Sequence, residues 1–157
     1  MKDFYAHARV ALKYGILDLG CKSGDSILVP SFICEAALTP FREIKVDIIF
    51  YPTKVDLSPS WPEIEDIIKK KKCFAILMVH YFGIPQNISE FTKFCKKNNI
   101  FLIEDNAHGF GGFLEDKVLG TFGDIGIASP RKILNIPSGA ILYKKNIICE
   151  PKLNKRK

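Results

Sequence analysis

The chain has 157 residues, of which 47% are hydrophobic and 25% are charged, and these ordinary globular proportions exclude a disordered or collagen-like chain. No apolar run approaches the ~20 residues needed to cross a bilayer, so no membrane partner is expected. The formal net charge is +6, but residues 144–157 hold six basic residues and one acidic residue, a net of +5, which leaves about +1 for the rest. Such a basic tail does not define a nucleic-acid-binding domain, so no specific nucleic-acid partner is expected either.

The cysteines and the amino end indicate the compartment. Five cysteines, an odd number without a CxxC pair, predict reduced thiols that lie partly in the core, and favour neither a disulfide framework nor a zinc site. The first ten residues have no apolar segment of the kind that a secretory signal requires. We therefore predict a cytoplasmic protein without a metal. The cysteines are Cys21, Cys34, Cys73, Cys95 and Cys149.

Short runs rich in β-branched residues alternate with helical patterns along the chain. The runs are nearly all apolar, which is typical of strands covered on both faces. Predicted strands are 26–30, 46–51, 74–81, 100–104, 124–129 and 139–143, and predicted helices are about 7–19, 33–42, 60–72 and 87–98. Ser60 is expected to begin the third helix, and Asn87 or Ser89 the fourth. This succession predicts an α/β fold of three layers, with a mostly parallel sheet between helices.

The segment 104–139 has a different composition, with seven glycines and no convincing long helix. Glycine-dense turns after the fourth strand indicate a binding site on the carboxyl side of the sheet, where open α/β sheets bind ligands. No G-x-G-x-x-G motif follows the first strand, and no GxxxxGK[ST] loop is present. A Rossmann dinucleotide enzyme and a P-loop NTPase are therefore disfavoured.

Two local motifs carry candidate chemistry. In IEDNAH, residues 103–108, an apolar strand ends in carboxylates, and such an acid either caps a turn or pairs with a buried cation or a protonated ring nitrogen. In GDIGIASPRK, residues 123–132, a strand leads to a hydroxyl and then to a lysine, a residue that by default is a solvated surface group. His80 either approaches this site from a strand end or, more commonly for such a residue, is a hydrogen-bonded core histidine.

With these motifs the chain resembles the DegT/DnrJ/EryC1/StrS family of sugar aminotransferases, which depend on pyridoxal 5′-phosphate, over about residues 6–145. The further matching segments are Ser23-Gly24-Asp25 before ILVPSF, VHYFG at 79–83, LGTFGDIGIASPRK at 119–132, and Ser138-Gly139. The resemblance implies the large domain of the aspartate-aminotransferase-like fold (fold type I) without its C-terminal small domain. It divides the chain into an incomplete cofactor-binding domain, 1–145, and a basic C-terminal tail, 146–157.

The resemblance also implies roles for individual residues. Lys132 is placed at the lysine that forms an aldimine with the cofactor aldehyde and later moves a proton. Asp105 is at the aspartate that pairs with the pyridinium nitrogen, and His108 is beside the phenolic oxygen. Ser129 is placed to bind the phosphate.

The phosphate and ring contacts include departures from the family pattern. A helix N-terminus at Ala8 and Arg9 is a second expected phosphate contact, but the family's Ser-Gly-Thr is replaced by His7-Ala8-Arg9, so charge replaces a hydroxyl there. The aromatic residue that stacks on the ring would fall near Cys34, with Phe32 close by, and we assign no stacking residue.

The implied reaction transfers an amino group from glutamate to a nucleotide-linked keto-sugar, in polysaccharide or antibiotic sugar biosynthesis. A dehydratase is disfavoured, because that branch of the family replaces the lysine by histidine. The chain is less than half as long as family members, so a remnant that at most binds the cofactor, or half of a split enzyme, is the alternative. The segment MKDFY leaves at most a reduced strand before the first helix. We expect a lost edge strand and exposed apolar surface, covered by a homodimer partner or a complementing C-terminal chain.

Overall fold

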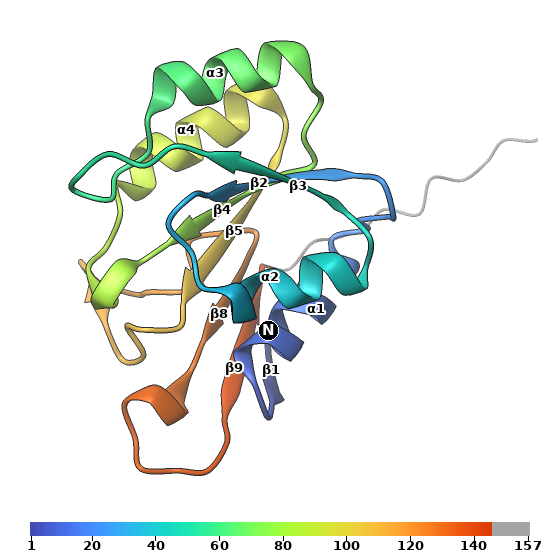
Figure 1. The fold of residues 1–157 in the computed structure, drawn as a ribbon. Coiled ribbons are helices and arrows are strands. Elements are labelled where there is room, and N and C mark those ends of the chain that lie inside the picture. The colour runs from blue at the N-terminus through green and yellow to red at the C-terminus, as the bar shows by residue number, and fades with distance from the viewer. Residues whose placement is uncertain (146–157) are drawn as a thin grey trace, which may run out of the picture.

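A seven-stranded sheet forms the middle of three layers, with α1 and α2 on one face and α3 and α4 on the other (Figure 1). This computed structural model describes residues 1–145. The predicted basic tail, 146–157, and Cys149 within it lie outside the described residues. The predicted three-layer arrangement is confirmed.

The elements follow the predicted succession. The strands are β1 Lys2–Tyr5, β2 Ser26–Pro30, β3 Asp47–Tyr51, β4 Ala75–Val79, β5 Phe101–Asn106, β6 Phe113–Leu114, β7 Lys117–Val118, β8 Ile125–Ala128 and β9 Ala140–Lys144. The helices are α1 Ala8–Asp18, α2 Glu35–Glu43, α3 Trp61–Lys70 and α4 Ile88–Asn98, with single 3₁₀ turns η1 Tyr81–Gly83 and η2 Pro130–Lys132. The longest helices have 11 residues, and none in the described part of the chain is long and apolar enough to cross a bilayer.

The sheet is mostly parallel, as predicted. Its strand order is β1-β9-β8-β5-β4-β2-β3, and β3, β2, β4, β5 and β8 pair in parallel. Only β9 runs against its two neighbours, β8 and β1. The carboxyl ends of the central strands therefore lie at one edge of the sheet, where ligands bind in folds of this type.

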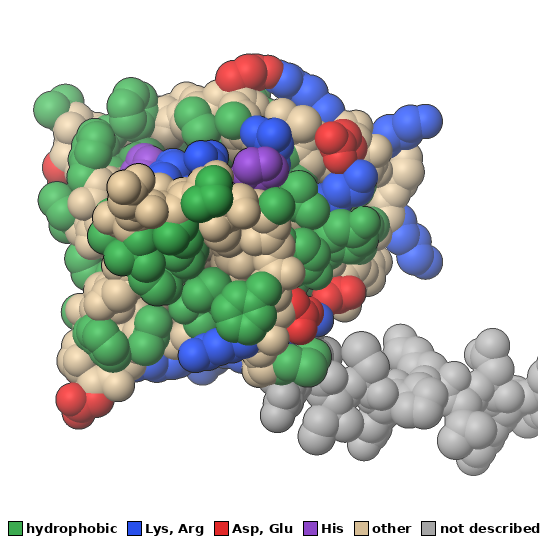
Figure 2. Space-filling view, turned by 90° about the horizontal axis from the view of Figure 1, so that it is seen from below, with side chains coloured by type: hydrophobic (Ala, Val, Ile, Leu, Met, Phe, Trp, Pro, Cys, Tyr) green, Lys and Arg blue, Asp and Glu red, His purple; other side chains and the backbone are tan. Residues whose placement is uncertain are grey.

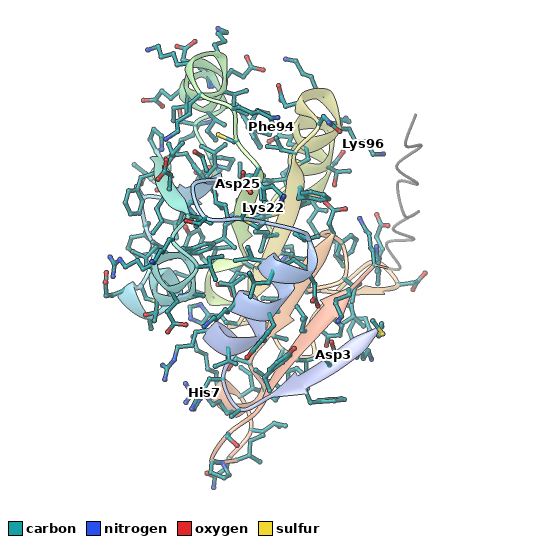
Figure 3. All side chains as sticks on the ribbon, turned by 90° about the vertical axis from the view of Figure 1, so that its right-hand side faces the viewer. Asp3, His7, Lys22, Asp25, Phe94 and Lys96 are labelled. Carbon is teal, nitrogen blue, oxygen red and sulfur yellow. The ribbon has the colours of Figure 1, made fainter. Side chains whose placement is uncertain are left out.

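The edge strand is present, so the expectation that it is lost was wrong. The four residues of β1 pair with β9 from Lys2↔Tyr143 to Tyr5↔Ala140. The Lys144 ammonium group lies 2.5 Å from the Asp3 carboxylate and 2.9 Å from the Asp18 carboxylate of α1, so one cation joins β1, β9 and α1. Figure 3 shows Asp3 on this strand beside α1. A short strand is sufficient here because β9 offers a complete free edge and this ion cluster reinforces it.

Each helical layer covers its face of the sheet with a separate apolar cluster. On the first face, Leu12 and Ile16 of α1 pack with Ile127 and Leu142 of the sheet. On the second face, α3 and α4 contribute their buried side chains, which include Phe91, to a cluster with the central strands. All residues of β2 and β4 are buried, as the uniformly apolar sequence of these strands predicts.

The helix starts follow the cap residues of the sequence. Ser60 precedes α3, whose first turn contains Pro62. Asn87, rather than Ser89, precedes α4, and its side-chain oxygen accepts a hydrogen bond of 3.3 Å from the Glu90 N–H. The small antiparallel hairpin of β6 and β7 was not predicted, because its two-residue strands are too short to give a pattern.

Gly126 of β8 lies where the chain packs too closely for a larger residue. A Cβ atom at this position would lie 1.9 Å from the backbone oxygen of Gly120. We expect Gly126→Ala to lower the free energy of unfolding by about 3 kcal/mol, the upper end for overpacked interiors. The control is Gly20→Ala, where φ is +86° and no atom lies within 4 Å, so that only left-handed backbone strain of about 1 kcal/mol arises. Urea denaturation measures both, and equal losses would contradict the predicted packing.

Candidate functional site

One cavity of about 430 Å³ lies at the carboxyl ends of β4, β5 and β8, next to the start of α1. It brings together all six residues that the sequence singled out, namely Ala8, Arg9, Asp105, His108, Ser129 and Lys132. The three histidines of the chain also line it. Figure 2 shows this end of the molecule, where histidine, lysine and arginine side chains are surrounded by hydrophobic ones.

Asp105 is the buried acid of the cavity. Its side chain is near the end of β5, the residue is 7% exposed, and a carboxylate oxygen accepts a 2.8 Å hydrogen bond from the Ala107 N–H. Burial raises the pKa of Asp105, while the Ala107 N–H and the positive charge of Lys132 act against this rise. The first interpretation of the strand-end acid therefore holds, because Asp105 caps a turn, and pairing with a cationic partner stays a prediction.

Ser129 and Lys132 follow β8 directly. Ser129 is 1% exposed, and its hydroxyl oxygen has no hydrogen-bond partner among the described residues. The 3₁₀ turn η2 then ends at Lys132, whose backbone N–H donates to the Ser129 carbonyl over 3.0 Å. This turn gives Lys132 an exposed side chain that still lines the cavity containing Asp105.

The N-terminus of α1 closes another side of the cavity. His7 precedes the helix in an extended conformation, its side chain makes no capping hydrogen bond, and the first turn has no acidic residue. The His7 Nδ1 atom is also buried without a partner in the described part of the chain. Figure 3 shows His7 at this end of α1. Uncapped N–H groups at a helix N-terminus favour an anion, and the unpartnered Ser129 hydroxyl lines the same cavity.

The turn after β4 forms an aromatic wall that the sequence had not assigned. Phe82 has a φ of 56°, an uncommon value for a bulky residue, and its ring is stacked on His108 at 6.2 Å with an interplanar angle of 16°. Gly83 permits this approach, since a Cβ there would lie 3.2 Å from the Gly109 Cα atom. Burial lowers the pKa of His108, and the positive charge of Lys132 lowers it further.

Further lining residues were missed or left unassigned. Phe32 and Tyr81 have ring centroids 5.6 Å apart, and the Tyr81 hydroxyl donates to the Phe32 carbonyl over 2.7 Å. Cys34 and Arg131 also line the cavity. The ILVPSF and VHYFG segments contain Phe32, Tyr81 and Phe82, but the sequence does not indicate which of these rings face the cavity. The described residues contain no group of three His, Cys, Asp or Glu that could hold a metal.

His80 is a core histidine and also a wall of the cavity. It is fully buried, its Nε2 lies 2.8 Å from a Glu104 carboxylate oxygen, and its Nδ1 accepts a 3.1 Å hydrogen bond from the Gln86 N–H. The more common of the two interpretations of this residue is therefore confirmed. The cavity as a whole combines an amine, a buried acid and an uncapped helix N-terminus, which favours an anion.

Comparison with known proteins identifies the family. A profile of the DegT/DnrJ/EryC1/StrS aminotransferase family matches residues 6–146. The chain belongs to this family. It is 32% identical over 123 residues to GDP-perosamine synthase of Escherichia coli O157:H7, covering 76% of this chain and 33% of that protein. It is 27% identical over 150 residues to GDP-perosamine synthase of Vibrio cholerae, covering 92% of this chain and 40% of that one.

Solved structures agree with this assignment. A DegT/DnrJ/EryC1/StrS aminotransferase from Brucella abortus superposes with a TM-score of 0.82 at 24% identity, covering 93% of this chain and 42% of that chain, and this likeness shows the fold. The GDP-4-keto-6-deoxy-D-mannose-3-dehydratase of E. coli, solved with bound hydrated pyridoxal phosphate, superposes with a TM-score of 0.74 at 25% identity. The match covers 91% of this chain and 39% of that chain. The fold is thus that of the fold type I aminotransferases, and the chain spans a third to two fifths of the length of these relatives.

The buried charge of Asp105 has a measurable consequence for the ligand-free protein. Because burial raises its pKa in the folded chain, Asp105 lowers stability as the pH rises through the folded-state pKa. Asp105→Asn removes the charge and keeps an oxygen that accepts the Ala107 N–H. We expect it to raise the thermal midpoint at pH 7 by roughly 2–4 °C and to leave it unchanged near pH 3.

Thermal unfolding followed by circular dichroism between pH 3 and pH 8 measures this difference. Asp105→Ala is the control, because it also removes the charge but leaves the Ala107 N–H without its acceptor. Its thermal midpoint should therefore rise less than that of Asp105→Asn. A wild-type protein more stable than Asp105→Asn at pH 7 would show that the carboxylate is favourably ionised without a ligand.

Proposed function

We propose that this chain is the cofactor-binding part of an aminotransferase that uses pyridoxal phosphate and acts on nucleotide-linked keto-sugars. The observation that carries the proposal is the Ser129 hydroxyl, which is 1% exposed and unpartnered and lines the same cavity as the uncapped start of α1. A buried hydroxyl without a hydrogen bond is unfavourable, and a phosphate oxygen would supply the missing partner. The first-turn N–H groups at Ala8 and Arg9, and the Arg9 charge, would bind the same phosphate.

The other end of the cavity suits the reactive part of the cofactor. Pyridoxal phosphate, when bound, withdraws electrons from the substrate carbon next to the nitrogen. The Asp105 carboxylate would hold the proton on the ring nitrogen, because a cation at that position stabilises the ionised form of this buried acid. The Lys132 Nζ atom would hold the cofactor aldehyde and, when released by the substrate, take up and return a proton.

The side walls would orient the ring. The Phe82 ring is stacked on His108, whose imidazole would meet the phenolic oxygen of the cofactor. Phe32 and Cys34 line the wall where the family places a stacking aromatic residue. The apolar lining by Val79 and Ile127 excludes water from the ring, which strengthens the electrostatic contacts within the cavity.

The substrate class is supported by the relatives. Two GDP-perosamine synthases and a dTDP-4-dehydro-2,3,6-trideoxy-D-glucose 4-aminotransferase of Saccharopolyspora spinosa are among them, and each name denotes amine chemistry on a nucleotide-linked sugar. We therefore propose glutamate as amino donor and a nucleotide-linked keto-sugar as acceptor. Relatives also include sugar 3-dehydratases, but the lysine at position 132 favours amine transfer.

A covering partner is part of the proposal. Ile133, Leu134 and Ile136 follow Lys132 in a loop whose residues 131–138 are all exposed, with Ile133 57% exposed. Exposed aliphatic side chains beside a cavity favour burial by another chain. A second copy or a complementing C-terminal chain would supply it. Residues 1–145 would then be the cofactor-binding domain of a larger unit, and a remnant that only binds the cofactor is the alternative. We also propose a cytoplasmic location, supported by the free thiols Cys21, Cys73 and Cys95, which are buried.

Cofactor binding through Lys132 is tested by absorption spectroscopy. We expect pyridoxal phosphate to give a visible band with the purified protein, and Lys132→Ala to abolish it. Arg131→Ala, which changes the neighbouring cation of the same turn, is the control and should keep the band. Loss of the band on adding glutamate would indicate amine transfer, whereas a Lys132-dependent band that does not respond to glutamate would support the binding remnant. A band that persists in Lys132→Ala would contradict the assignment.

The phosphate contact is tested with two ligands. Ser129→Ala is expected to weaken pyridoxal phosphate about tenfold, the effect of losing one hydrogen bond to a charged group. Its effect on pyridoxal, which lacks the phosphate, should be less than twofold. The variant should unfold at the same urea concentration as wild type or a higher one, since it removes an unpartnered buried hydroxyl. Equal weakening of both ligands would show that Ser129 does not bind the phosphate.

A further inference from the structure

A second buried carboxylate lies behind the cavity and has no role in the proposed function. Glu104 is fully buried and precedes Asp105 on β5. Successive side chains of a strand point to opposite faces, so Glu104 lies on the face of the sheet away from the cavity, the same face as Leu102. An ionised side chain in such a position is unfavourable unless hydrogen bonds compensate it.

Hydrogen bonds occupy both oxygens of Glu104. One oxygen accepts from His80 Nε2 over 2.8 Å and from the Gly120 N–H over 2.6 Å. The other accepts from the N–H groups of Phe122 over 2.6 Å and Gly123 over 2.9 Å. Four donors match the acceptor capacity of an ionised carboxylate.

The histidine partner is held in one tautomer. His80 Nδ1 accepts the Gln86 N–H, so in the neutral ring the proton lies on Nε2 and is donated to Glu104. Although burial acts to raise the pKa of Glu104, the hydrogen bonds from His80 and from the Gly123 and Gly120 N–H groups outweigh it, and the pKa lies below its ordinary value. Glu104 is therefore an anion at neutral pH.

The donors come from two segments that continue into the walls of the cavity. His80 is followed by Tyr81 and Phe82, and the Phe82 ring stacks on His108. The segment 120–123 leads into β8, at whose end Ser129 and Lys132 lie. Both segments are tied to one carboxylate, and that carboxylate is adjacent in the chain to Asp105.

We propose that Glu104 is a positioning residue for the cofactor site, which sets the aromatic turn after β4 and the end of β8 relative to Asp105. This inference rests on the proposed function for its role in binding, but the geometry it describes exists without a ligand. The two acidic residues of the EDNAH motif then have different roles, because they lie on opposite faces of the strand. Asp105 faces the cavity, and Glu104 holds the cavity walls from the opposite face.

The test compares Glu104→Gln with Asp124→Asn. Glutamine presents an amide nitrogen to two of the four donors, so two hydrogen bonds are lost while the side-chain shape is kept. Asp124 also accepts a backbone hydrogen bond near the start of β8, from the Leu102 N–H over 2.8 Å, but it contacts neither His80 nor the cavity. Asp124→Asn therefore controls for general destabilisation.

Two readouts are measured, pyridoxal phosphate affinity and the pKa of His108 by NMR without ligand. We expect Glu104→Gln to weaken the binding of pyridoxal phosphate at least tenfold. We also expect it to raise the His108 pKa toward its ordinary value, because Lys132 and the walls that bury His108 would move away from it. Asp124→Asn should change affinity less than twofold and leave the His108 pKa unchanged. Unchanged affinity and His108 pKa in Glu104→Gln, or the same changes in both variants, would overturn the proposal.

The outcomes separate this inference from the proposed function. If the wild-type protein does not bind pyridoxal phosphate, the proposed function fails, while the His108 titration still decides whether Glu104 positions the walls. If Glu104→Gln does not fold, His80→Asn breaks the same connection from the other side, because asparagine can accept the Gln86 N–H but is too short to reach Glu104. The same rise of the His108 pKa is then expected, and its absence would overturn the proposal.

Discussion

The end of β5 divides three consecutive polar residues between the two faces of the sheet, and the site depends on this division. Asp105 faces the cavity, whereas Glu104 and Asn106 face the glycine-rich segment on the other side. The Asn106 side-chain N–H₂ group donates to the carbonyls of Gly109 over 3.0 Å and Leu119 over 3.1 Å. A segment with little regular structure can pack against the sheet only if its backbone groups find such partners. The two flanking side chains supply them, and Asp105 remains available for a ligand.

The cavity contains unfavourable features that a bound ligand would remove together. Burial raises the pKa of Asp105, and the Ser129 hydroxyl and the His7 Nδ1 atom are buried without partners in the described residues. A molecule that carries both a phosphate and a cationic ring would supply partners for the Ser129 hydroxyl and the Asp105 carboxylate at once. Because it would bind only the folded chain, it would also stabilise the fold. Stability given up at these positions is therefore consistent with a binding site rather than with defective packing.

Much of the fold followed from the sequence, because the central strands are covered on both faces and are uniformly apolar. The sequence predicts that either Asn87 or Ser89 caps the start of α4, since both residue types are common helix caps. Only the structure identifies Asn87 as the capping residue. The edge strand β1 was missed because its stability comes from pairing with β9 and from the Lys144 ion cluster, which are distant in sequence. The resemblance to the family singles out six residues that the structure places around one cavity, whereas the proposed role of Glu104 depends on backbone donors that no sequence pattern indicates.

The central claim is that Lys132 is the amine that holds pyridoxal phosphate in the cavity that contains Asp105. Reduction of the protein–cofactor mixture with sodium borohydride, followed by proteolysis and mass spectrometry, identifies the lysine that carries the cofactor. The account predicts that the pyridoxyl group is found on Lys132, in the peptide that follows β8. A label on another lysine of the chain, or one spread over many surface lysines with Lys132 unmodified, would contradict it.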